Sequence, residues 1–163
     1  MVPLMSFWPS VYKRILNQEK LIEYRRRFPK DCKYAYMYIS KPVKAICGII
    51  YFGRMHSLED WAREFKDDPQ IMSRIQEYSD SYNFGMEIVA IQKINPISLD
   101  ELRKNITGFT APQSYLLLEN NEKLKHYIES HVQYNGEKIV NDLEKGQGGH
   151  GISVYGEGSL YFK

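Results

Sequence analysis

The segment EKLIEYRRRFPK, residues 19–30, carries charged side chains at a spacing that could do chemistry. In an extended strand, Glu23 and Arg25 lie on the same face, roughly 6.6 Å apart along the chain, which is close enough for an ion pair. A guanidinium held by a carboxylate presents its planar fork to a phosphate or a base edge with less loss of entropy than a free arginine. The segment therefore indicates a phosphate or base contact, with a charged edge strand that resists aggregation as the alternative.

Lys20 and Arg26 flank this pair, and each has a more ordinary interpretation. Lys20 is either a solvated amine, which the sequence favours, or a desolvated amine that does acid–base chemistry beside Glu23. Arg26 is predicted on the opposite strand face with Tyr24, where its stem has to leave the core. Lys20 and Glu23 are candidate catalytic residues only if the amine is desolvated and the protein is an enzyme, and Arg26 is a weaker binding candidate than Arg25.

Common catalytic and cofactor signatures are missing from the sequence. It contains no G-x-x-x-x-G-K-[ST], H-E-x-x-H or G-x-S-x-G motif. Among its histidines, His126 and His131 are five residues apart, which is not the i, i+4 spacing that places two imidazoles on one metal ion. We therefore expect no metal site and no cofactor.

Size and charge limit the classes of protein to which the chain can belong. It has 163 residues, which suits one compact domain, and its formal net charge of +2 is too small to attract a polyanion by itself. Any site for an anionic partner must therefore be local. The sequence shows no C-x-x-C pair and no secretory signal, and its longest apolar run, AICGIIYF, is too short to cross a bilayer. These features predict a cytoplasmic protein without a membrane segment.

Tyrosines gather in YAYMYI, residues 34–39, and in EYSDSY, residues 77–82. Alternation in the first run predicts a half-buried strand with the tyrosines on one face. Such a face could stack nucleobases. We favour the more common alternative, in which the tyrosines form one wall of a β-rich core.

Hydrophobic periodicity and helix-start signals divide the chain into elements. Residues 1–5 show no pattern and are expected to be loose. Ser57 with Asp60, and Ser98 with Glu101, resemble capping boxes that open helices. The predicted strands cover residues 20–28, 33–39, 43–55 and 84–94, and the predicted helices cover residues 9–18, 57–65, 69–78, 98–104 and 119–131.

Strands on both sides of a helical insertion predict an α+β fold, with a small β-barrel or strongly bent sheet and flanking helices. Seven of the 11 glycines lie between Gly136 and Gly158, in a segment with little to bury. We therefore expect one domain over residues 6–131 and a flexible, glycine-rich C-terminal extension over residues 132–163.

Several segments resemble the ASCH family, the activating signal cointegrator homology domains of the PUA-like superfold. These segments are ILNQEKLIEYRRRFP, YISKPVKAICGII, INPISLDELRK and FTAPQSYLLL, spread over residues 9–118. The family's signature is Gly-x-Lys-x-x-Glu-x-Arg, and the chain resembles it at Lys20, Glu23 and Arg25. Gln18 stands in place of the signature's glycine, the residue type that most easily adopts a positive φ.

The resemblance implies a PUA-like β-barrel with a cleft beside it. It also implies RNA binding, with a role in RNA processing or in the regulation of transcription or translation. By this analogy, Glu23 orients Arg25 within the cleft. The residues implied to contact RNA or a nucleotide-containing ligand are Lys20, Glu23, Arg25, Arg26, Ser40, Lys41, Gln113 and Ser114.

Three hypotheses stay open beside RNA binding. A minority of small ASCH proteins resemble amidohydrolases of acetylcytidine-type nucleosides, with a lysine at the position of Lys20 and a threonine at that of Glu23. The chain has a carboxylate in place of this hydroxyl nucleophile, so the amidohydrolase hypothesis ranks second. Ribonuclease activity ranks below it, because the sequence shows neither paired histidines nor metal-binding carboxylates. The last alternative is an adaptor that binds a protein partner and no nucleic acid.

Overall fold

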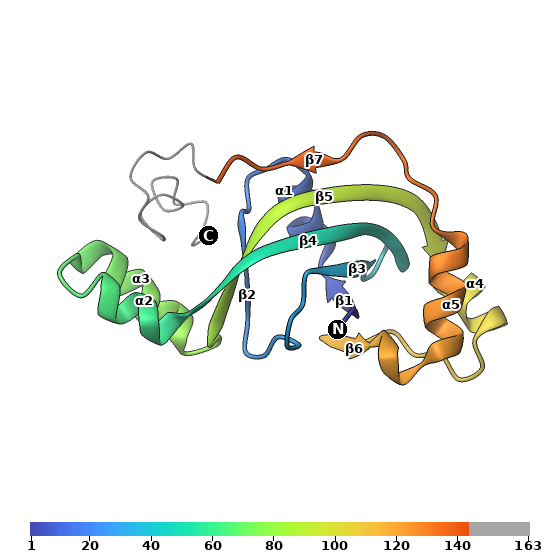
Figure 1. The fold of residues 1–163 in the computed structure, drawn as a ribbon, viewed down its shortest axis with the longest axis horizontal. Coiled ribbons are helices and arrows are strands. Elements are labelled where there is room, and N and C mark those ends of the chain that lie inside the picture. The colour runs from blue at the N-terminus through green and yellow to red at the C-terminus, as the bar shows by residue number, and fades with distance from the viewer. Residues whose placement is uncertain (144–163) are drawn as a thin grey trace.

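The computed structural model describes residues 1–143, which form one curled mixed sheet with helices around it (Figure 1). The strand order is β2-β5-β4-β3-β1-β6, and β7 pairs with β5. β1 runs parallel to β3, and the other neighbours are antiparallel. The strands are β1 Pro3–Phe7, β2 Ile22–Arg25, β3 Tyr34–Ile39, β4 Ala45–Ser57, β5 Phe84–Ser98, β6 Tyr115–Leu117 and β7 Ile139–Val140.

The sheet bends into a half-barrel, which confirms the α+β, PUA-like fold class. The long strands β4 and β5 cross the molecule and connect two helical ends, with α2 and α3 at one end and α4 and α5 at the other (Figure 1). The helices are α1 Pro9–Leu16, α2 Leu58–Glu64, α3 Pro69–Ser79, α4 Leu99–Asn105 and α5 Glu122–His131, and residues Leu118–Asn120 form a short 3₁₀ helix. None of the helices in this part of the chain has the length and apolar character needed to span a bilayer.

The two predicted capping boxes open the helices expected of them. Ser57 Oγ accepts a hydrogen bond from the backbone N–H of Asp60 at the start of α2. Ser98 Oγ accepts one from the N–H of Glu101 at the start of α4. Each bond satisfies a backbone donor that a helix N-terminus otherwise leaves without a partner.

The core lies on both faces of the sheet, and β3 contributes to each. Tyr36 and Tyr38 belong to one hydrophobic cluster, while Ala35, Met37 and Ile39 belong to the other. The predicted alternation is therefore confirmed, but the prediction of a half-buried strand was wrong, since residues 35–39 are all buried. Both faces of β3 are covered, because a hydrophobic cluster packs on each side of the sheet.

The N-terminal segment is part of the sheet, so the expectation that residues 1–5 are loose was wrong. β1 lies between β3 and β6, and Leu4 and Met5 are completely buried. A short parallel strand that is buried on both faces lacks the alternation by which strands are recognised in a sequence.

The sheet also includes residues beyond the expected C-terminal boundary at residue 131. β7 pairs with β5, and Asn141 Nδ2 donates to the carbonyl of Ile88 over 2.7 Å. The glycine-rich part of the predicted extension, residues 144–163, lies outside the described residues.

Candidate functional site

The turn between α1 and β2 brings the signature lysine into the protein. After α1 ends at Leu16, the backbone N–H groups of Glu19 and Lys20 both donate to Arg14 O, over 2.9 and 3.2 Å. The chain therefore folds back along the last turn of the helix. As a result Lys20 is buried, with only 9% of its surface exposed.

Gln18 stands in place of the signature's glycine and has a backbone conformation that glycine adopts most easily. Its φ is 59°, in the left-handed region, where a side chain costs roughly 1–2 kcal/mol. Its Nε2 donates to Val140 O over 3.2 Å and to Asn141 Oδ1 over 3.1 Å, which offsets part of this cost. The Gln18 side chain thus connects the turn to β7.

Lys20 forms a buried ion pair, so the prediction of a solvated amine was wrong. Its Nζ lies 3.6 Å from Glu23 Oε2 and 5.3 Å from the centre of the Tyr24 ring. Burial lowers the pKa of the Lys20 amine, because desolvation disfavours the charged form, while the Glu23 carboxylate acts in the opposite direction. A lysine with a lowered pKa is a better proton acceptor near neutral pH than a surface lysine.

Glu23 is the central member of this charged cluster. The side chain is buried, and Oε1 accepts a hydrogen bond from Arg25 Nε over 2.9 Å, which confirms the predicted ion pair. Oε2 has no hydrogen-bond partner, and its contact with Lys20 is longer than a hydrogen bond. Because Oε2 is itself buried, the negative charge of Glu23 is balanced by Lys20 and Arg25.

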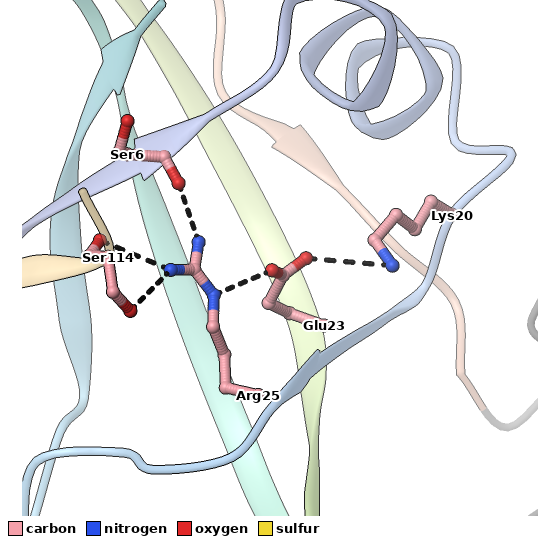
Figure 2. Close-up of polar contacts among 5 residues, drawn as sticks. All are labelled: Ser6, Lys20, Glu23, Arg25 and Ser114. Carbon is pink, nitrogen blue, oxygen red and sulfur yellow. Dashed lines mark hydrogen bonds and ion pairs between the residues drawn. The ribbon is translucent and has the colours of Figure 1, made fainter. Parts of the chain in front are cut away.

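Arg25 connects the two ends of the curled sheet, and Figure 2 shows its contacts. From β2 it reaches Ser6 of β1, where Nη2 donates to the carbonyl over 2.7 Å, and Ser114, where Nη1 donates to the carbonyl and to Oγ over 3.1 and 3.2 Å. Protein acceptors thus engage each of its nitrogens. This geometry makes Arg25 a positioning residue that links the two ends of the sheet and holds Glu23.

A cleft of about 510 Å³ opens beside the cluster, and we call it the inner cleft. Tyrosine rings form part of its wall. Tyr24 stacks on Tyr78 with 4.7 Å between ring centres, and Tyr82 lies 5.9 Å from Tyr78. The lining residues are Ser6, Phe7, Trp8, Ser10, Val11, Arg14, Lys20, Glu23, Tyr24, Arg25, Tyr78, Tyr82 and Gln113.

A second cleft of about 690 Å³ shares Ser6 and Trp8 with the first, and we call it the basic cleft. Its lining includes Lys41, Lys44 and Arg103 and no aspartate or glutamate. The remaining lining residues are Pro9, Tyr38, Ser40, Leu99, Ala111 and Pro112.

The residues predicted to form one site are thus divided among three places. Four of them, Lys20, Glu23, Arg25 and Gln113, line the inner cleft, where Ser114 contacts the Arg25 guanidinium. Ser40 and Lys41 line the basic cleft instead. Arg26 lines neither cleft, and its Nε donates to Ser81 O over 2.8 Å.

Sequence reasoning missed Trp8, Arg14, Lys44 and Arg103, and it did not assign the tyrosines of residues 77–82 to a site. Tyr78 and Tyr82 are four residues apart, so a helical pattern could have placed both rings on one face. Lys44 and Arg103 gave no signal, because they are far from the signature in the sequence. Within residues 1–143, no group of three or more His, Cys, Asp or Glu side chains has a geometry that could hold a metal ion.

The fold and the site together define a small α+β protein with a cleft of about 510 Å³ beside a curled sheet. No family model matches the sequence. An ASCH domain-containing ribonuclease from Zymomonas mobilis subsp. mobilis is 31% identical over 134 residues, which cover 75% of this chain and 87% of the relative. The chain therefore belongs to the ASCH domain family.

Crystal structures of ZmASCH from Zymomonas mobilis have the same fold. The structure of the protein itself gives a TM-score of 0.60 at 23% identity, and that of a serine-to-alanine mutant gives 0.61 at 22% identity. Each comparison covers 81% of this chain and 96% of the other. At this level of identity, the likeness concerns the fold alone.

Proposed function

We propose that this protein binds RNA, with a nucleotide in the inner cleft and a role in RNA processing. The observation that carries this proposal is the buried cluster of Lys20, Glu23 and Arg25 on the wall of a cleft that also contains stacked tyrosine rings. The family relative described as a ribonuclease supports RNA as the ligand.

Each part of the inner cleft matches one part of a nucleotide. Tyr78 and Tyr82 offer ring faces on which a base can stack. The amide of Gln113 can form a hydrogen bond with a base edge, and Lys20 and Arg14 offer positive charge for a phosphate. A volume of about 510 Å³ is within the range of small-molecule sites.

The other predicted binding residues take secondary roles in this proposal. Gln113 contributes an amide to the inner cleft, and Ser114 helps Arg25 to hold Glu23. Ser40 and Lys41 contact the RNA further along, in the basic cleft. Arg26 is exposed and makes at most an outer phosphate contact.

The test replaces the buried amine without shortening its stem. We expect Lys20→Met to weaken binding of a fluorescein-labelled single-stranded RNA by tenfold or more, measured by fluorescence anisotropy at several salt concentrations. Lys66→Met is the matched control, because Lys66 is an exposed lysine that lines neither cleft. Equal affinities of the two variants would remove the inner cleft from the proposal.

RNA cleavage is a second candidate function, favoured by the lowered pKa of Lys20 and by the name of the relative. In this reaction the neutral amine of Lys20 takes the proton of a ribose 2′-hydroxyl. The O2′ atom of that hydroxyl attacks the adjacent phosphorus. A bond forms from O2′ to phosphorus, the bond to O5′ breaks, and the leaving O5′ takes a proton from water. The products are a 2′,3′-cyclic phosphate and a free 5′-hydroxyl.

This second function requires the 2′-hydroxyl. We expect a labelled RNA to be cut to a 2′,3′-cyclic phosphate, detected by mass spectrometry, and Lys20→Met to abolish the product. An RNA with one 2′-deoxyribose should resist cleavage at that residue. Cleavage at the deoxy position would contradict the mechanism.

The comparisons do not favour the amidohydrolase alternative, and Glu23 offers no hydroxyl nucleophile for it. A cytoplasmic location, a role in the regulation of transcription or translation, and the adaptor hypothesis stay predictions. Release of acetate from acetylcytidine by the protein, and its loss in Lys20→Ala, would restore the amidohydrolase hypothesis.

A further inference from the structure

Trp8 has a position that the fold does not explain. It lies between β1 and α1 and is 74% exposed. It occupies the N-cap of α1, where short polar side chains are favoured, yet it makes no capping hydrogen bond. An indole that neither fills the core nor caps a helix is available to a ligand.

Trp8 stands where the two clefts meet. It lines both the inner cleft and the basic cleft, and only Ser6 does the same. Its neighbour Pro9 restricts the backbone at the start of α1. The indole is therefore carried on an ordered part of the chain, between the tyrosine wall on one side and the cations on the other.

The basic cleft has uncompensated positive charge. Lys41, Lys44 and Arg103 are exposed, and none of them forms an ion pair within residues 1–143. Since no acidic residue lines this cleft, its charge is complementary to a phosphodiester chain.

We propose that Trp8 stacks on a base of a single-stranded RNA that spans both clefts, with its phosphates bound by Lys41, Lys44 and Arg103. This inference rests on the proposed function and narrows the ligand to a chain of two or more nucleotides. Tryptophan is well suited to this task, because every base has a π-face and stacking tolerates any sequence.

The experiment tests whether the effect of a substitution at residue 8 on RNA affinity depends on the length of the RNA. Dissociation constants are measured for a mononucleotide and for a single-stranded hexanucleotide, with the wild type and the variants Trp8→Ala, Trp8→Phe and Lys20→Met. We expect Trp8→Ala to weaken hexanucleotide binding about tenfold and to weaken mononucleotide binding clearly less. Trp8→Phe should retain most of the affinity, because phenylalanine keeps a ring face.

Tryptophan fluorescence gives an independent readout. The sequence has two tryptophans, and Trp61 is only 1% exposed, so a ligand that stacks on Trp8 should quench the exposed component. We expect this quenching with the hexanucleotide and its loss in Trp8→Phe. The melting temperatures of the Trp8 variants serve as the control for folding.

The outcomes separate this inference from the proposed function. If Lys20→Met weakens RNA binding while Trp8→Ala does not, RNA binding stands and the stacking role of Trp8 falls. Equal losses for the mononucleotide and the hexanucleotide would overturn the two-cleft path, because Trp8 would then be a wall of the inner cleft. Failure of the wild type to bind either RNA, with self-association or a protein contact that depends on Trp8, would overturn both.

Discussion

The inner and basic clefts carry similar charged groups in opposite physical settings. In the inner cleft, Lys20 and Glu23 are buried and paired, and Arg25 is engaged by protein acceptors. In the basic cleft, Lys41 and Lys44 are exposed and have no ion-pair partner in the described part of the chain. Residue type alone does not tell the two settings apart.

This difference assigns different tasks to the two clefts. Buried charges have already lost their water, so their geometry is set before a ligand arrives and can be selective. Exposed cations act through a field that is screened over about 8–10 Å at ordinary salt, so they attract a polyanion without fixing its orientation. We therefore expect substitutions in the inner cleft to change stability and those in the basic cleft to change the salt dependence of binding.

The largest effect on stability is expected for Glu23→Ala. This change leaves Lys20 and Arg25 as buried charges without a counterion, which costs about 3–5 kcal/mol of the free energy of unfolding. Denaturant titration measures this change in the free energy of unfolding. Glu19→Ala is the control, since Glu19 is exposed in the same turn and should change stability little. Equal shifts of the two denaturation midpoints would show that burial of the cluster has no energetic consequence.

A smaller effect on stability is expected from Lys20→Met, and this effect depends on pH. Because the folded-state pKa of Lys20 is lowered from its ordinary value of 10.5, the unfolded chain binds more protons between the two values. The contribution of this group to stability therefore rises with pH across that window. Unfolding is measured from pH 7 to pH 10 for the wild type and the variant. We expect the stability of the variant relative to the wild type to fall with pH, and a constant difference would contradict the lowered pKa.

The smallest effect on stability is expected for Lys44→Gln and Arg103→Gln, within about 0.5 kcal/mol, because both side chains are exposed. Their effect should be on binding instead. Each lost phosphate contact should make the slope of log K against log salt less steep by about 0.7 for a single-stranded ligand. Binding measured at four salt concentrations tests this, and unchanged slopes would separate the basic cleft from the RNA path.

Local signals were sufficient for most of the elements. Ser57 and Ser98 marked two helix starts because a cap acts within one turn of chain. The long runs that became β4 and β5 were recognisable from composition. β1 and β7 were missed because their pairing partners lie far away in the sequence, and neither segment carries a strand pattern of its own.

Only the part of the site that lies within one strand was predicted from the sequence. The spacing of Glu23 and Arg25 gave their ion pair, because a strand places alternate side chains on one face. The burial of Lys20 depends on the turn at Gln18, and the acceptors of Arg25 come from Ser6 and Ser114 on distant segments. Strand spacing contains no information on either feature.

The amino-acid sequence by itself determined the α+β class, the helix starts, the Glu23–Arg25 pair and the resemblance to the ASCH family. Only the tertiary structure decided that Lys20 is buried, that Arg25 connects the two ends of the sheet, and that Trp8 lines both clefts. The physical reason is the range of the interactions. Capping and strand alternation act between neighbours in the chain, whereas desolvation and clefts arise where segments from opposite ends of the domain meet.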